Sequence, residues 1–130
     1  MAGLDNYVVD ASIILQWLLP DEKDLRSSEF FQRAKLGGVK IMAPEILLYE
    51  ILNGIKSALI SRRLNKQQAG GAVKTFMALE IDWQNQKNDS ARVMGIALKY
   101  NLSVYDASYV ALAKKLKIKL LSLDKKLQNL

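Results

Sequence analysis

The chain of 130 residues contains no cysteine and no histidine. Without cysteine there are no disulfides, no thiol nucleophile and none of the thiolate ligands that structural zinc sites usually need. Without histidine there is no Ser-His-Asp triad and no imidazole general base. Oxygen ligands remain, and clustered carboxylates suit hard cations such as magnesium or manganese. Any chemistry is therefore expected to combine carboxylates with a divalent metal ion.

Long hydrophobic runs are also missing. No stretch approaches the roughly 18 apolar residues that a membrane-spanning helix needs. The start, Met1 to Asn6, has no positive flank followed by an apolar run, so we expect no signal peptide. With 50% hydrophobic and 25% charged residues, the composition is typical of a folded soluble domain. We expect a single domain over residues 1–130 that is cytoplasmic and makes no membrane contact.

The formal net charge of +6 permits two interpretations. A basic protein attracts polyanions and speeds their arrival, which makes nucleic acid a natural partner. A modest excess of positive charge is equally ordinary for solubility. Six lysines between Lys114 and Lys126 repeat this ambiguity, because they could line a phosphate path or form a solvated helix end.

Three short apolar stretches are each followed by an aspartate and a helical pattern. They are Tyr7–Val9 before Asp10, Leu102–Val104 before Asp106, and Lys119–Leu123 before Asp124. In an open parallel sheet, residues just past the strand ends gather at one edge, where such folds place their sites. We therefore expect these three carboxylates to share one small space.

Structural roles compete with this interpretation at several positions. Asp10 could simply cap the helix that follows it. Ser12 could hydrogen-bond a neighbouring carboxylate or be only a polar residue in the first helical turn. Glu50 lies opposite the apolar stripe of its predicted helix, so the pattern alone favours a solvent-facing glutamate.

Strand and helix patterns alternate along the rest of the chain. This alternation predicts right-handed βα units and a parallel sheet with helices on both faces. Pro44-Glu45 is expected to open the third helix, and Gly70-Gly71 to mark a break or a close contact. The other predicted elements are helices over 11–19, 25–36, 46–62, 65–79, 88–100 and 107–116, and strands over 39–43 and 81–83.

Four segments, taken together, resemble PIN-domain ribonucleases, and most closely the VapC-like toxins of prokaryotic toxin–antitoxin pairs. The third segment is the most specific, and the order and spacing of all four reinforce one another. The segments are Val9–Ser12, Pro44–Asn53, Tyr105–Ala113 and Leu121–Asp124.

The resemblance implies a three-layer α/β/α sandwich on a small parallel sheet with strand order 3-2-1-4-5. It also implies RNA cleavage with magnesium or manganese, a cognate VapB-like antitoxin and frequent homodimers, for which the hairpin over 46–79 offers apolar surface. The implied site residues are the acids Asp10, Glu50, Asp106 and Asp124 with the hydroxyl residues Ser12 and Ser122.

A mechanism is expected from these residues. The three aspartates would hold the cation directly or through water, while Glu50 would orient an outer water or a second ion. In-line attack by hydroxide would leave a 5′-phosphate and a 3′-hydroxyl. Two alternatives stay open: a non-catalytic PIN-like module that binds RNA or antitoxin, and a receiver-like signalling domain. The latter normally has adjacent acids after the first strand, whereas Asp10 is followed by Ala11.

Overall fold

The computed structural model describes residues 5–130. Part of the expectation about a signal peptide falls on residues 1–4, which lie outside this range. In chain order the elements are β1 (Asp5–Val9), α1 (Ala11–Leu18), α2 (Leu25–Lys35), β2 (Val39–Pro44), α3 (Ile46–Ile60), α4 (Lys66–Met77), β3 (Ile81–Gln84), the 3₁₀ helix η1 (Lys87–Asp89), α5 (Ser90–Tyr100), α6 (Val104–Leu116), β4 (Lys119–Leu121) and α7 (Lys125–Gln128).

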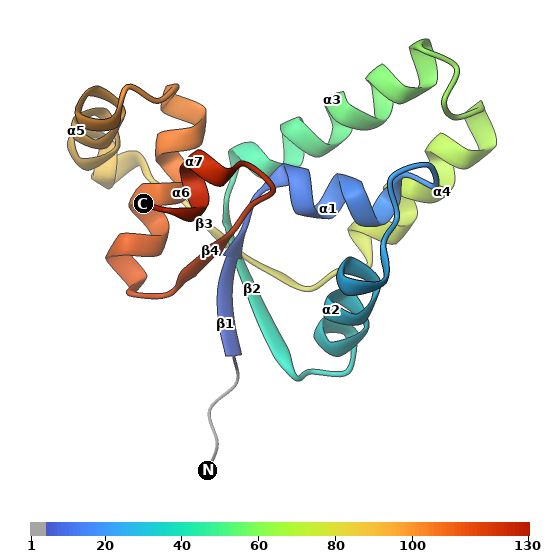
Figure 1. Ribbon diagram of the computed structural model, residues 1–130, viewed down its shortest axis with the longest axis horizontal. Helices are drawn as coiled ribbons and strands as arrows, with labels where there is room; N and C mark the ends of the chain where they lie inside the picture. Colours follow the sequence, from blue (N-terminus) through green and yellow to red (C-terminus); the bar gives the residue numbers. More distant parts are fainter. Residues whose placement is uncertain (1–4) are drawn as a thin grey trace.

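The four strands form one parallel sheet in the order β3-β2-β1-β4. Helices α5 and α6 lie on one side of this sheet and α1 and α2 on the other (Figure 1). The three-layer α/β/α prediction is confirmed, and the strand order agrees with the expected 3-2-1-4 portion. A fifth strand is not found within residues 5–130.

Helix α6 forms the centre of one layer. Its seven residues from Ala107 to Ala113 are all buried, because the sheet covers one side and α5 covers the other. Alanines at 107, 111 and 113 allow this close approach of neighbouring elements. The buried run fixes the first turn of α6 near the carboxyl ends of β1 and β2.

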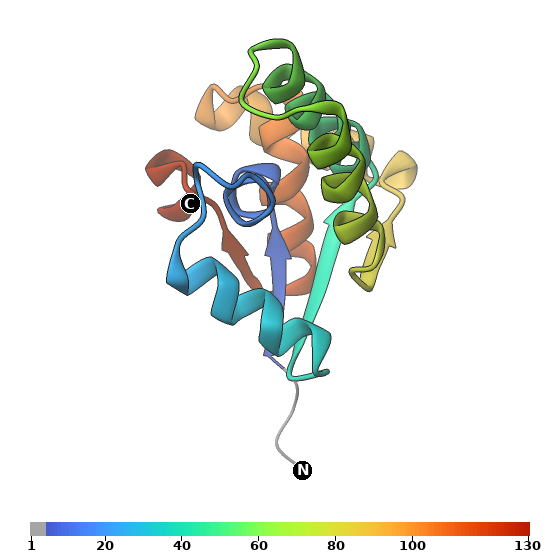
Figure 2. The same ribbon diagram turned by 90° about the vertical axis from the view of Figure 1, so that its right-hand side faces the viewer.

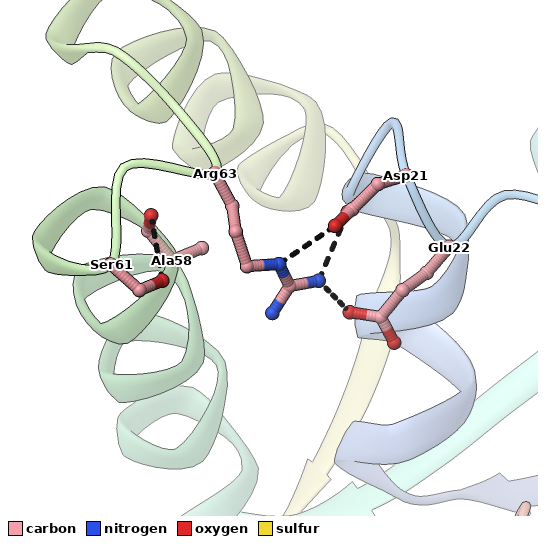
Figure 3. A network of polar contacts seen from close by, with 5 residues as sticks. All are labelled: Asp21, Glu22, Ala58, Ser61 and Arg63. Carbon is pink, nitrogen blue, oxygen red and sulfur yellow. Dashed lines mark hydrogen bonds and ion pairs between the residues drawn. The ribbon is translucent and has the colours of Figure 1, made fainter.

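Helices α3 and α4 form an antiparallel hairpin beyond the carboxyl ends of the strands (Figure 2). Asn65 and Gln68 form a capping box at the start of α4, with hydrogen bonds of 2.8 and 2.9 Å. The guanidinium of Arg63 joins the turn of this hairpin to the α1–α2 connection by pairing with Asp21 at 2.7 Å and with Glu22 (Figure 3). The hairpin is thereby tied to the sheet-covering layer.

The strand predicted over Leu102–Val104 is wrong. Helix α5 ends at Asn101 in the left-handed conformation (φ 52°), and α6 begins only three residues later. Ser103 caps α6 by accepting a hydrogen bond of 3.0 Å from the Asp106 amide. A connection this short leaves no room for a strand, so Asp106 lies in the first turn of a helix.

Other boundaries also differ from the predictions. Pro44 is the last residue of β2 and does not open α3. The predicted effect of Gly70 and Gly71 is wrong, because α4 is continuous there and a β-carbon added at either glycine would meet no atom within 4 Å. Asp89 precedes α5 without a side-chain cap and instead pairs with Lys115 at 2.7 Å.

No helix in the described part of the chain combines the length and apolar character that crossing a membrane requires.

Candidate active site

Asp10 lies at the carboxyl end of β1 and is 7% exposed. Its Oδ1 accepts hydrogen bonds from the Ser12 amide at 3.1 Å, the Ile13 amide at 3.4 Å and the Ser12 hydroxyl at 2.5 Å. The residue therefore does cap α1, as the structural interpretation predicted. These three bonds all go to Oδ1, and the Ser122 hydroxyl is a further hydrogen-bond partner of the Asp10 carboxylate.

Two serines join the β1–α1 junction to the segment after β4. The Ser12 hydroxyl, which donates to Asp10, also accepts a hydrogen bond of 2.9 Å from the Leu123 amide. The Ser122 hydroxyl accepts one of 3.0 Å from the Asp124 amide and is also a hydrogen-bond partner of the Asp10 carboxylate. Leu123 thus belongs to this junction, and β4 ends at Leu121 rather than at 123.

Glu50 of α3 is half-buried, and Tyr109 of α6 reaches its carboxylate. Its Oε1 accepts a hydrogen bond of 2.5 Å from the hydroxyl of Tyr109, a side chain that is only 1% exposed. The helical pattern of α3 alone favoured a solvent-facing glutamate. The contact with a helix almost sixty residues further along the chain explains why that pattern was insufficient.

Asp106 is partly exposed in the first turn of α6. It lies close enough to Glu50 for its charge to raise the pKa of the Glu50 carboxyl. One residue further along, α6 enters its fully buried run, so the backbone that carries Asp106 is firmly held.

Asp124 is linked to Asp10 through the hydroxyls of Ser12 and Ser122. It is exposed at the start of α7, where its Oδ1 accepts a hydrogen bond of 2.9 Å from the Lys126 amide. Its connection to Asp10 runs through the serine junction described above. As the side chains stand, no three carboxylates within residues 5–130 converge closely enough to bind one ion together.

Burial is the main cause of the shifted pKa values in this site. It raises the pKa of Asp10, and the hydroxyls of Ser12 and Ser122 oppose this rise. It also raises the pKa of Glu50, where the bond from Tyr109 opposes the rise and the charges of Asp106 and Asp10 add to it. Burial and the Glu50 carboxylate both raise the pKa of Tyr109, so this phenol remains a donor at neutral pH.

The ion pairs of the described residues do not include any of these four acids. Glu50, Asp10 and Asp106 therefore form a negatively charged group with no cationic side chain to compensate it. We call these three residues the acidic group.

Tyr109 is the residue of this site to which the sequence prediction gave no role. It follows Asp106 by three positions, which places the two on neighbouring turns of one helix. That spacing was the available signal, but a buried aromatic residue at helical spacing is more often only part of the core.

The lysines near the carboxyl end are all exposed, but three of them already have partners. Lys115 pairs with Asp89 at 2.7 Å, Lys126 donates to the Asn101 carbonyl at 3.2 Å, and Lys114 donates to the Leu130 carbonyl at 3.3 Å. These contacts support the interpretation of solvated, locally paired side chains for half of the run.

A cleft of about 540 Å³ borders the serine junction on its outer side. It lies between α1, α2, β4 and α7, and its walls include Arg26, Lys119, Ser122 and Leu123. None of the four predicted site acids lines this cleft. The acidic group and the cleft are therefore neighbouring but separate features.

Comparison with known proteins shows the family of this chain. The family model for the PIN domain matches residues 7–130. Ribonuclease VapC3 of Pyrobaculum aerophilum is 32% identical over 124 residues, which cover 92% of this chain and 90% of the relative. Ribonuclease VapC9 of Mycobacterium tuberculosis is 32% identical over 127 residues, which cover 94% of this chain and 88% of the relative.

Solved structures show the same fold at lower identity. A crystal structure from Pyrobaculum aerophilum superposes with a TM-score of 0.73 at 20% identity, covering 98% of this chain and 86% of that one. VapC20 of Mycobacterium tuberculosis, described as a toxin that cleaves the sarcin-ricin loop, superposes with a TM-score of 0.66 at 16% identity, covering 95% and 93%. With the match to the family model and the relatives above 30% identity, the chain belongs to the PIN domain family.

Proposed function

We propose that this protein is a VapC-type endoribonuclease toxin that hydrolyses RNA phosphodiesters with a divalent metal ion. The observation that carries the proposal is the acidic group of Asp10, Glu50 and Asp106, which has no cationic side chain among the described residues to balance it. Relatives that are named VapC ribonucleases, and that this chain matches over most of their length, support it.

Magnesium or manganese fits the donors that are present. All are carboxylate or hydroxyl oxygens, which hard divalent cations prefer. Magnesium keeps several waters and often uses only one or two carboxylates, so it does not require three side chains to converge on one point. Asp10 and Asp106 are the proposed direct ligands, with Glu50 and Asp124 acting directly or through water.

Within this site each residue would have a distinct task. A bound divalent ion supplies Lewis acidity, which makes a water more acidic and offsets negative charge that develops on the phosphate. Ser12 and Ser122 hold the β4–α7 segment against Asp10 and so keep Asp124 near the site. Glu50 would orient the attacking water. With no histidine to activate a ribose 2′-hydroxyl, we expect 5′-phosphate and 3′-hydroxyl products.

Protein partners are a further part of the proposal. A solved VapBC2 complex from Rickettsia felis superposes on this chain with a TM-score of 0.66, and we propose a VapB-like antitoxin here as well. The α3–α4 hairpin exposes Tyr49 (65%), Ile60 (69%) and Met77 (66%). This apolar surface would suit the antitoxin or a second copy in a homodimer, with action on RNA in the cytoplasm.

The proposed activity is tested with purified protein and RNA in magnesium or manganese, in EDTA, and with Asp106→Asn. We expect cleavage with metal and none in EDTA, and with metal a rate about 10²–10³-fold lower in Asp106→Asn because one stabilising charge is lost. Equal cleavage in every condition would mean that a contaminant cuts the RNA. End-labelling of the products would establish where the phosphate remains.

A non-catalytic PIN-like module that binds RNA or antitoxin is the second candidate. The observation in its favour is that no three carboxylates of the described residues converge as the side chains stand. It predicts tight RNA binding with no cleavage product in either metal. Membership of the PIN domain family favours both candidates over a receiver-like domain.

A further inference from the structure

Tyr109 and Glu50 form a contact whose purpose the roles assigned so far do not explain. The phenol reaches from the buried face of α6 to α3 and donates to Oε1 of Glu50 at 2.5 Å. A buried hydroxyl needs an acceptor, but a backbone carbonyl would serve. The neighbouring Ser108 shows this, because its buried hydroxyl donates to the Tyr105 carbonyl at 2.6 Å.

The identity of the donor matters because it carries no charge. Where this chain balances acids it uses a cationic side chain: Arg63 pairs with Asp21 and Glu22, and Lys115 pairs with Asp89. A phenol holds a carboxylate in one orientation and leaves its negative charge in place. Tyr109 thus fixes Glu50 beside Asp10 and Asp106, against the repulsion between them, without reducing the attraction of the group for a cation.

The bond also divides the two oxygens of Glu50 between two tasks. Oε1 is occupied by Tyr109, whereas Oε2 has no hydrogen-bond partner among the described residues. We propose that Tyr109 is a positioning residue that locks Glu50 so that only Oε2 is presented to a divalent cation or its water. This inference rests on the proposed metal-dependent function and assigns to Tyr109 a role in it.

Tyr109→Phe tests the inference, because it removes the hydroxyl and keeps the ring in the core. Ser108→Ala is the matched control, since it removes a neighbouring buried hydroxyl of α6 that does not touch Glu50. We expect the manganese dissociation constant, measured by calorimetry, to rise about 10–100-fold in Tyr109→Phe, the range for loss of a residue that orients a ligand. Ser108→Ala should change it less than twofold.

A double-mutant cycle separates positioning from a general structural effect. In a Glu50→Ala background, Tyr109→Phe should leave manganese affinity nearly unchanged, because there is no carboxylate left to orient. In otherwise unmodified enzyme, Tyr109→Phe should lower the kcat for RNA and leave KM unchanged. Should Tyr109→Phe not fold, Glu50→Asp breaks the same bond by shortening the carboxylate arm, and it should weaken manganese binding similarly.

Two results would overturn the inference. One is manganese affinity in Tyr109→Phe equal to that of Ser108→Ala. The other is a loss of affinity that persists in full when Glu50 is absent. Failure of the proposed function would look different, because unmodified protein would then bind no manganese and cut no RNA, whatever residue stands at 109.

Discussion

Two sets of acidic residues in this molecule differ in how their charge is balanced. Asp21 and Glu22 lie on the surface and face Arg63, which lowers the pKa of Asp21 through a hydrogen bond (Figure 3). Asp10 and Glu50 are more buried and have raised pKa values, and a further carboxylate instead of a cation lies near them. The negative charge of the first set is balanced by an arginine of the chain itself. The negative charge of the second set would be balanced only by a cation from outside, and this is the physical basis of the proposed metal site.

The largest effect on RNA cleavage is expected for Asp10→Asn, and Asp21→Asn is the variant with which it is compared. Asparagine can still cap α1 and removes a charge that burial disfavours, so the metal-free thermal midpoint at pH 7.5 should rise. RNA cleavage should fall about 10²–10³-fold, because one charge of the site is lost.

Asp21→Asn should show the opposite pattern. It removes a paired charge, so the thermal midpoint should fall slightly, while cleavage should stay unchanged because Asp21 is far from the acidic group in the fold. Differential scanning fluorimetry and a gel assay measure both quantities. A lower midpoint in both variants would contradict the distinction between the two sets.

The pH dependence of stability should sharpen the contrast. For a carboxyl whose folded pKa is raised, the stabilising contribution is complete below the unfolded pKa and is lost as pH rises through the folded value. Ionisation of the Asp10 and Glu50 carboxyls, whose pKa values are raised, should therefore lower the stability of the metal-free protein as pH rises from about 4 toward 7. Asp21, whose pKa is lowered, contributes stability above its unfolded value and loses it as pH falls.

Magnesium provides the control for this pH prediction. It binds the ionised carboxylates, so it should restore stability above pH 6 and have little effect near pH 4. Thermal midpoints collected from pH 4 to 8 in EDTA and in magnesium would test this. An equal rise of the midpoint at all pH values would point to ion binding at other groups.

The smallest effect is expected for Arg63→Ala. Exposed ion pairs contribute little to stability, even where two acids share one guanidinium. Chemical denaturation should show a slightly lower free energy of unfolding, and the loss should shrink at high salt. The rate of RNA cleavage should be unaffected when it is measured at low protein concentration. A large loss of activity would mean that the hairpin position, and not only the acidic group, controls the reaction.

Much of the fold could be predicted from local patterns. The apolar run before Asp10 and the helices predicted over 25–36 and 65–79 depend on signals within a few residues, so they are visible in sequence. The prediction of a strand over Leu102–Val104 was wrong because so short a run of apolar and polar residues also fits a linker between two helices.

The candidate site was less accessible to such reasoning. Residues near strand ends indicated Asp10 and Asp124, and the family resemblance added Glu50. The environment of Glu50, however, depends on Tyr109, which packs against it from a helix distant in sequence. No periodicity within α3 could report that contact. The position of Asp124 likewise depends on a contact between distant parts of the chain, because Ser12 holds the adjacent Leu123.

The most direct test of the central claim is anomalous diffraction from a crystal soaked in manganese. We expect a manganese peak beside Asp10 that is also within reach of Asp106 or of Oε2 of Glu50, and no comparable peak beside Asp21 and Glu22. A peak only elsewhere on the surface, or none at saturating manganese with the acidic group well ordered, would contradict it.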